Sequence, residues 1–195
     1  MNFAELTIIP LVVLAISSVF LMVSQNWRWS IAILAIQYLA AFWMVTLVWP
    51  FGLAVVKLIA GWMAGAVLSA GRPEEDLIEE AGASLARMLF RVIAAGLILA
   101  LIVSIMPLAA ARLPVSLQLL EGGLILIGLG LLHLGMTTRP LRVVLGLLTV
   151  LLGFEIIYAA LETSILIAGL QAMITLGLAL IGAYLLSVSV MEEAG

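Results

Sequence analysis

The residue with the clearest potential for chemistry is Glu155, which lies in the middle of the apolar stretch 151–158. A bare carboxylate in hydrocarbon costs roughly 2.5 kcal/mol or more, so it usually faces other protein or a wet cavity and marks a functional site. Tyr158 and Glu162 follow at spacings of three and seven, which places all three side chains on one helix face. Such a stripe could pass protons through intervening water.

Further polar residues interrupt the apolar runs of the chain: Lys57, Glu121, Gln37, Gln171 and His133. A helix rises about 1.5 Å per residue, which places most of this set in the outer half of a membrane and His133 nearer the inner side. Burial favours the neutral form of a carboxyl group, whereas a nearby ammonium favours the charged form. Glu155 and Lys57 could therefore form a pair whose charge changes when one partner moves.

Each of these polar residues also has a structural interpretation. Lys57 could form a structural ion pair or extend its ammonium toward the membrane surface. Glu121 could be an interfacial acid, and Glu162 could cap the helix that follows it. His133 could be a packed, hydrogen-bonded side chain, and the two glutamines could join helices by hydrogen bonds.

The elements that must position these residues are membrane-spanning helices. The chain has 195 residues, is 66% hydrophobic and has a mean hydropathy of +1.35. The hydrophobic fraction of a soluble domain is lower, at about 45–50%. We predict an all-α integral membrane protein, since these runs are apolar on every side and do not alternate as barrel strands do. About seven runs approach the length of a span, and they cover residues 6–23, 29–48, 51–69, 88–110, 117–136, 141–161 and 164–188. Glycines in the fifth run indicate close helix packing.

The distribution of arginines predicts the orientation in the membrane. Only Arg112 flanks one set of helix ends, whereas the other set is flanked by Arg28, Arg72, Arg87, Arg91, Arg139 and Arg142. Positive charge concentrates in cytoplasmic loops. We therefore predict a multi-pass protein of the cell membrane with the N-terminus outside and the C-terminus in the cytoplasm.

One segment of the chain, residues 71–87, is strongly charged. A run of acidic residues follows Pro73, a pattern typical of the first turn of a helix. We expect a short surface helix on the cytoplasmic side. This segment could be a solvated linker or a docking site for the basic surface of a partner.

The composition argues against an active site within this chain. The sequence contains no cysteine, one histidine and no glycine-rich phosphate loop. We therefore expect no metal site, no cofactor and no catalytic residue here, and any redox reaction would take place in a partner.

The region 121–186 resembles a known family. Its motifs are LLHLG at 131–135, the basic turn TRPLR at 138–142, Gly153-Phe154-Glu155, and LGLAL at 176–180. This order is similar to the three-helix K-type (4L) subunit of respiratory complex I and to the matching small subunit of Mrp-type cation/proton antiporters. The resemblance implies a unit over 111–195 in which Glu155 is the intramembrane glutamate of the family.

The full length resembles component E of hydrogenase-4, in which further helices precede the same unit. The segments AIQYL at 35–39 and VVKLI at 55–59 carry this likeness. It implies an N-terminal four-helix membrane segment over 1–110, with the charged cytoplasmic loop inserted at 71–87.

Two departures from the K-type pattern matter. Met173 stands where that family has its second intramembrane glutamate; the nearest polar residue is Gln171, and Glu162 could substitute from another position. The distance from the basic turn to Glu155 is also about one helical turn longer than in the family, which preserves the helix face but shifts the depth.

The resemblance implies a small membrane-arm subunit that lies beside large antiporter-like subunits and a possible peripheral redox module. Glu155 would contribute to proton or cation translocation, with Lys57 as its modulator. Supporting candidates are Glu162, Tyr158, Gln171, His133 and Glu121.

Two other functions are open. The chain could be a purely structural subunit that bridges larger subunits, with Glu155 in a buried ion pair. It could also be a stand-alone transporter, although the sequence shows no paired repeats with broken helices, the usual pointer to a substrate site.

Overall fold

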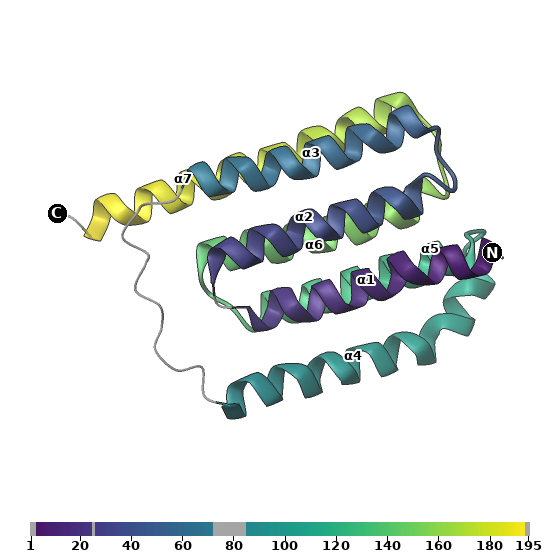
Figure 1. Cartoon of the computed structure of the whole chain (residues 1–195), viewed down its shortest axis with the longest axis horizontal. Coiled ribbons are helices and arrows are strands. Elements are labelled where there is room, and N and C mark those ends of the chain that lie inside the picture. Colours follow the sequence, from purple (N-terminus) through teal and green to yellow (C-terminus); the bar gives the residue numbers. More distant parts are fainter. Residues whose placement is uncertain (1–2, 25, 72–84, 194–195) are drawn as a thin grey trace.

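The computed structural model describes residues 3–24, 26–71 and 85–193, and within these ranges the chain is helical without any strand (Figure 1). The helices are α1 (Phe3–Val23), α2 (Trp27–Val45), α3 (Phe51–Ala70), α4 (Leu85–Arg112), α5 (Leu117–Gly135), α6 (Pro140–Ala159) and α7 (Ile165–Glu193). The predicted all-α fold is confirmed, and each helix lies within a few residues of the run that predicts it.

Six of the described helices, α2 to α7, are long and apolar enough to cross a membrane. In α1 the apolar stretch Thr7–Val23 is slightly shorter, with 17 residues. A span needs about 20 apolar residues, with a lower limit near 17. The chain is therefore a multi-pass membrane protein.

The helices form two sets of three that stack against each other (Figure 1). In each set the chain runs forward, back and forward again, so that α1 packs beside α5, α2 beside α6 and α3 beside α7. The starts of the paired helices are offset by nearly the same number of residues: 114 for α1 and α5 (3 and 117), 113 for α2 and α6 (27 and 140) and 114 for α3 and α7 (51 and 165). The sequence hid this repeat because aligned positions share few residues.

The remaining helix, α4, packs on the outside of α5 and α1 and connects the two sets (Figure 1). The predicted boundary at 110–111 falls at its C-terminal end, at Arg112. Most of the charged segment 71–87, with its expected surface helix, lies outside the described residues.

Close approach of α5 and α6 depends on two facing glycines. A Cβ atom added to Gly153 would lie 2.6 Å from the carbonyl oxygen of Gly123, and one added to Gly123 would lie 2.8 Å from that of Gly153. Small residues at such crossings allow helix backbones to pack closely in membranes. This contact holds α6, which carries Glu155, at the centre of the bundle.

Arginines gather at one end of the bundle. The Arg91 Nη1 atom donates to the carbonyl oxygen of Met22 at 3.0 Å, and the Arg142 Nη2 atom donates to that of Ser24 at 2.9 Å. Both arginines thereby cover carbonyl groups at the C-terminal end of α1, where a helix carries partial negative charge. That this end faces the cytoplasm remains a prediction of the arginine distribution.

Candidate functional site

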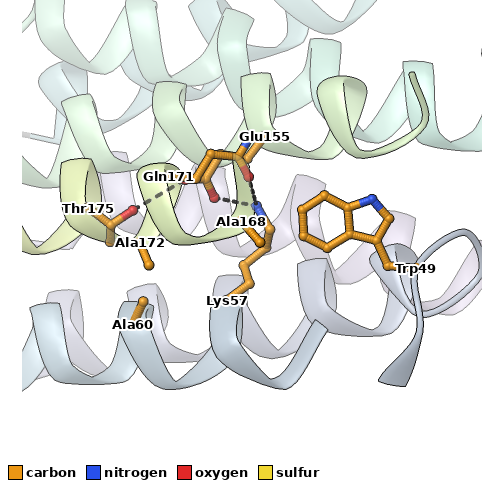
Figure 2. Close-up of a pocket in the computed structure, with 8 residues that line it drawn as sticks. All are labelled: Trp49, Lys57, Ala60, Glu155, Ala168, Gln171, Ala172 and Thr175. Atoms are coloured by element: carbon orange, nitrogen blue, oxygen red, sulfur yellow. Dashed lines mark hydrogen bonds and ion pairs between the residues drawn. The ribbon is translucent and has the colours of Figure 1, made fainter. Parts of the chain in front are cut away.

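The most polar part of the buried interior is an ion pair between the two helix sets (Figure 2). Lys57 of α3 extends its ammonium toward Glu155 of α6, and the Nζ and Oε2 atoms lie 2.6 Å apart. The two side chains are only 4% and 2% exposed. The predicted pairing of these residues is confirmed.

Two polar side chains of α7 complete this site. The Lys57 ammonium also donates to Gln171 Oε1 at 3.3 Å, and the Thr175 hydroxyl donates to Glu155 Oε1 at 3.3 Å. Gln171 and Thr175 are four residues apart and share one face of α7. We call Lys57, Glu155, Gln171 and Thr175 the Lys57–Glu155 cluster. It joins α3, α6 and α7.

Small side chains allow α3 and α7 to close around the cluster. Ala60, Ala168 and Ala172 line the space beside the ion pair (Figure 2). Because these side chains are short, the two backbones can approach and the Lys57 stem can cross between them. The alanines also offer no polar atoms of their own, so the charged groups depend on each other.

Trp49 closes the cluster on the side of the α2–α3 and α6–α7 turns. It lies in the turn between α2 and α3, and its ring centroid is 5.6 Å from the Lys57 Nζ atom. Its indole N–H donates to the carbonyl oxygens of Ala159, at 2.9 Å, and Glu162, at 3.1 Å. Trp49 thus supplies a cation–π contact and ties this turn to the α6–α7 turn.

A small cavity of about 10 Å³ adjoins the ion pair. Its walls include Trp49, Lys57, Glu155, Gln171 and Thr175. This volume has room for about one water molecule, and a polar lining of this kind gives a water enough partners to bind. The carboxylate therefore has space for a small proton-carrying molecule next to it.

A second buried polar group lies around Gln37 of α2 and has no charge. Its Nε2 atom donates to Ser18 Oγ of α1 at 3.0 Å, and its Oε1 atom accepts from the Thr149 hydroxyl of α6 at 3.2 Å. We call Gln37, Ser18 and Thr149 the Gln37 cluster. The prediction that Gln37 and Gln171 join helices by hydrogen bonds is confirmed.

Tyr38 is fully buried beside the Lys57–Glu155 cluster. Its ring covers Gly61 of α3, where a side chain would overlap it. The hydroxyl has no hydrogen-bond partner among the described residues.

Three residues of this site were missed in the sequence: Trp49, Tyr38 and Thr175. The available signals were their positions. Thr175 follows Gln171 by one helical turn, Tyr38 adjoins Gln37, and Trp49 immediately precedes a proline. None of these signals shows on its own which helix the side chain faces.

The expected stripe of Glu155, Tyr158 and Glu162 does not form, because α6 ends at Ala159. Glu162 lies in the exposed turn that follows, where only its backbone carbonyl contacts the site, through Trp49. Tyr158 is half-buried, and its ring lies 5.7 Å from the exposed ring of Phe154. Glu155 is therefore the member of the predicted stripe that enters the cluster.

Two other predicted residues lie away from the cluster. Glu121 is partly exposed in the first turns of α5. His133 is buried two residues before the end of α5, where it interacts electrostatically with Arg91 and Arg142. Its ring nitrogens have no hydrogen-bond partner within the described residues, so the side chain is packed but not hydrogen-bonded as expected. Its place near the inner side of the membrane stays a prediction.

Met173, at the position of the second glutamate in the K-type pattern, is 72% exposed on α7. Gln171 and Thr175 on either side of it in sequence are buried. A carboxylate at position 173 would therefore point out of the bundle. Within the described ranges no three His, Asp or Glu side chains could together hold a metal ion.

Comparisons of the chain with family models, curated proteins and solved structures find no match. The resemblance to membrane-arm subunits therefore stays a prediction. The function of the chain must be inferred from the chemistry of the Lys57–Glu155 cluster.

Proposed function

We propose that this chain is a small membrane-arm subunit of an assembly related to complex I, hydrogenase-4 or Mrp-type antiporters, in which Glu155 contributes to proton or cation translocation. The observation that supports this is the Lys57–Glu155 ion pair, with both side chains almost fully buried. Ionisable residues within spans are rare because they are costly, and they mark ion pathways and proton relays.

The chemistry of the pair suits a proton carrier. The Lys57 Nζ atom lies 2.6 Å from Glu155 Oε2 and supplies the counter-charge of the buried carboxylate. If the ammonium moved away, a bare carboxylate in apolar surroundings would be costly, and a proton would be the alternative counter-charge. Movement of Lys57 by a partner subunit would thus load and unload Glu155.

The proposed partners follow from the proposed role. A single carboxylate cannot connect the two membrane surfaces, because a span is about 30 Å thick. Large antiporter-like membrane subunits would supply the remaining groups, and a peripheral redox module would supply the energy where one is present. The chain itself would bind no cofactor.

A second candidate function is structural bridging without proton transfer. One observation favours it: the pair joins helices of both three-helix sets, and both carboxylate oxygens have partners, Lys57 Nζ and Thr175 Oγ1. Such satisfied buried pairs can specify one arrangement of helices. Under this alternative, Glu155 would matter for assembly and not for transport.

The test is a Glu155→Gln variant, which removes the charge but keeps the shape and hydrogen-bonding capacity of the side chain. We expect the assembly to form normally and proton translocation in membrane vesicles to fall to background. The matched control is Glu162→Gln, the same chemical change at the exposed turn outside the cluster, and it should translocate normally.

Other outcomes would select the alternatives. Full translocation by Glu155→Gln would exclude the proton-carrier role. Loss of the assembly in both Glu155→Gln and the double variant Lys57→Met with Glu155→Leu, which leaves no buried charge unpaired, would favour the structural role; mild-detergent purification and mass spectrometry would detect it. Translocation by the purified chain alone in liposomes would identify a stand-alone transporter.

A further inference from the structure

The Lys57 ammonium occupies a position with the features of a cation-binding site. Two side-chain oxygens approach its Nζ atom, Glu155 Oε2 at 2.6 Å and Gln171 Oε1 at 3.3 Å. The Trp49 ring adds an aromatic contact, with its centroid 5.6 Å from Nζ. Carboxylate and amide oxygens are ligands that hard metal cations prefer, and aromatic faces also attract cations. The groups around Nζ would therefore suit a free monovalent cation as well as an ammonium.

The space beside the ion pair excludes a second cation. The cavity of about 10 Å³ has room for about one water molecule and not for a hydrated ion. The charges of Lys57 and Glu155 balance, so a further cation would leave a buried positive charge without a partner, which is strongly unfavourable. Because the ammonium is bound covalently to α3, it stays within reach of the site when the pair opens.

A proton does not meet these obstacles. It bonds directly to one carboxylate oxygen, so it needs neither a ligand shell nor free volume. A metal cation must instead exchange its water shell for several protein oxygens. Ala60, Ala168 and Ala172 line much of the remaining space and offer no side-chain oxygens. While Lys57 is present, Glu155 can therefore exchange its counter-charge for a proton but not for a metal cation.

We propose that Lys57 determines the ion specificity of the site: its ammonium occupies the place of a bound monovalent cation, excludes Na⁺ from Glu155 and leaves the proton as the ion that Glu155 carries. The inference rests on the proposed function of Glu155 as a carrier, and it selects the proton from the ions left open there. It also predicts how the site behaves without Lys57. Four side-chain oxygens would then lie beside a vacant space: Glu155 Oε1 and Oε2, Gln171 Oε1 and Thr175 Oγ1.

The experiment measures the thermal stability of the purified full-length chain in NaCl and in N-methylglucamine chloride at equal ionic strength. N-methylglucamine is too bulky for the site, so a difference between the two salts reports Na⁺ binding and not charge screening. Lys57→Ala removes the ammonium and most of its stem. The matched control, Lys57→Met, removes the same charge but fills the space with an unbranched stem. A double variant, Lys57→Ala with Glu155→Gln, removes the carboxylate charge as well.

We expect the parent chain to melt at the same temperature in both salts. Lys57→Ala should melt below the parent in N-methylglucamine chloride and recover in NaCl, with a saturable dependence on Na⁺ concentration. For one site with a dissociation constant of about 10 mM, NaCl at about 100 mM would favour the folded chain about elevenfold. Lys57→Met and the double variant should show no difference between the salts, because the first lacks the space and the second lacks the charge.

A binding measurement on the parent chain tests the same point even where Lys57→Ala does not fold. The immobilised parent should retain no more radioactive sodium than Glu155→Gln does. Sodium bound by the parent and lost in Glu155→Gln would overturn the exclusion of Na⁺. A folded Lys57→Ala chain that melts equally in both salts would overturn it too, because the oxygens would then not form a cation site.

Failure of this inference is distinguishable from failure of the proposed function, which is tested by translocation in the Glu155→Gln assembly. If that assembly translocates normally, Glu155 carries no ion, and the inference fails together with the proposed function. If the assembly is inactive while the parent chain binds Na⁺ through Glu155, the carrier role stands and only the ion specificity assigned to Lys57 is overturned.

Discussion

The two buried polar clusters join helices in similar ways but differ in charge. The Lys57–Glu155 cluster connects α3, α6 and α7, and the Gln37 cluster connects α1, α2 and α6. Both therefore use α6 and reach across the boundary between the two helix sets. Only the first contains ionised side chains and adjoins a cavity.

The hydrogen bonds of the Gln37 cluster explain why it suits a fixed role. The Ser18 hydroxyl donates to the carbonyl oxygen of Leu14 in its own helix at 2.7 Å, and the single hydrogen of the Thr149 hydroxyl has two acceptors within reach, Gln37 Oε1 and the carbonyl oxygen of Leu145 at 2.9 Å. Their hydroxyls keep these partners whatever Gln37 does. Neutral groups satisfied in this way gain little by rearranging, so the cluster locks the helices together.

In the Lys57–Glu155 cluster, each of the three side-chain hydrogen bonds joins two different helices. The charge on each residue is balanced by a residue of another helix, so displacement of one helix leaves a buried charge without its partner. Under the proposed function, this dependence on a partner from another helix is what would allow movement of one helix to open the pair.

The largest effect should come from removing one half of the ion pair. Glu155→Ala leaves the Lys57 ammonium buried without its counter-charge and should destabilise the protein by about 3–5 kcal/mol. The double variant Lys57→Met with Glu155→Leu removes both charges and keeps the volume, so its stability should return to within about 1–2 kcal/mol of the parent. Unfolding free energies from steric trapping in bicelles would measure this.

The relative stability of Glu155→Ala and the double variant tests whether the Lys57–Glu155 cluster is closed to water. If Glu155→Ala is no less stable than the double variant, the Lys57 ammonium reaches water when unpaired, and the cluster is not the closed site described above. The Lys57→Met single variant tests the same ion pair by removing the ammonium and leaving the Glu155 carboxylate unpaired. Its unfolding free energy completes the comparison with Glu155→Ala and the double variant.

A smaller effect is expected from Gln37→Leu, which removes both hydrogen bonds of the Gln37 cluster. Hydrogen bonds between membrane helices contribute about 0.6 kcal/mol each on average, so the loss should be about 1 kcal/mol. Translocation should not change. A clear fall in translocation with normal assembly would contradict a purely structural role for the Gln37 cluster.

Much of the fold could be predicted because it depends on the length of apolar runs. Turn residues such as Pro50 and Pro140 also bounded several helices within a residue or two. The end of α6 was less certain: no glycine or proline marks it, and the two extra residues predicted there placed Glu162 on the same face as Glu155. The nearly constant offset between the two helix sets could not be predicted, because the two sets share helix lengths and packing but few identical residues.

The charged half of the site could also be predicted, since Glu155, Lys57 and Gln171 are conspicuous in apolar helices. Their pairing was a reasonable expectation of membrane energetics and is confirmed. Thr175, Tyr38 and Trp49 could not be selected, because hydroxyl and aromatic residues are common in spans and carry no penalty that demands a partner. Their role depends on the rotation of each helix and on which helices become neighbours.

The smallest expected effect tests whether the turn near the ion pair is part of the cluster. Trp49→Phe keeps an aromatic face near Lys57 but removes the indole N–H that reaches Ala159 and Glu162. The loss in stability should be under about 1 kcal/mol, in line with one interhelical hydrogen bond. Hydrogen exchange should nevertheless rise at the α6–α7 turn, residues 160–164, because Trp49 holds two of the carbonyls at that end.

The exchange at the opposite end of α6 is the internal control. Residues 140–144 lie away from Trp49, so their exchange should match the parent in Trp49→Phe. If both ends exchange faster, the variant has loosened the whole helix and Trp49 acts as a packing residue. If only the turn exchanges faster, Trp49 holds the α6–α7 turn in place beside Lys57 and Glu155, and its indole N–H is part of the cluster's closure and not of the packing of the whole helix.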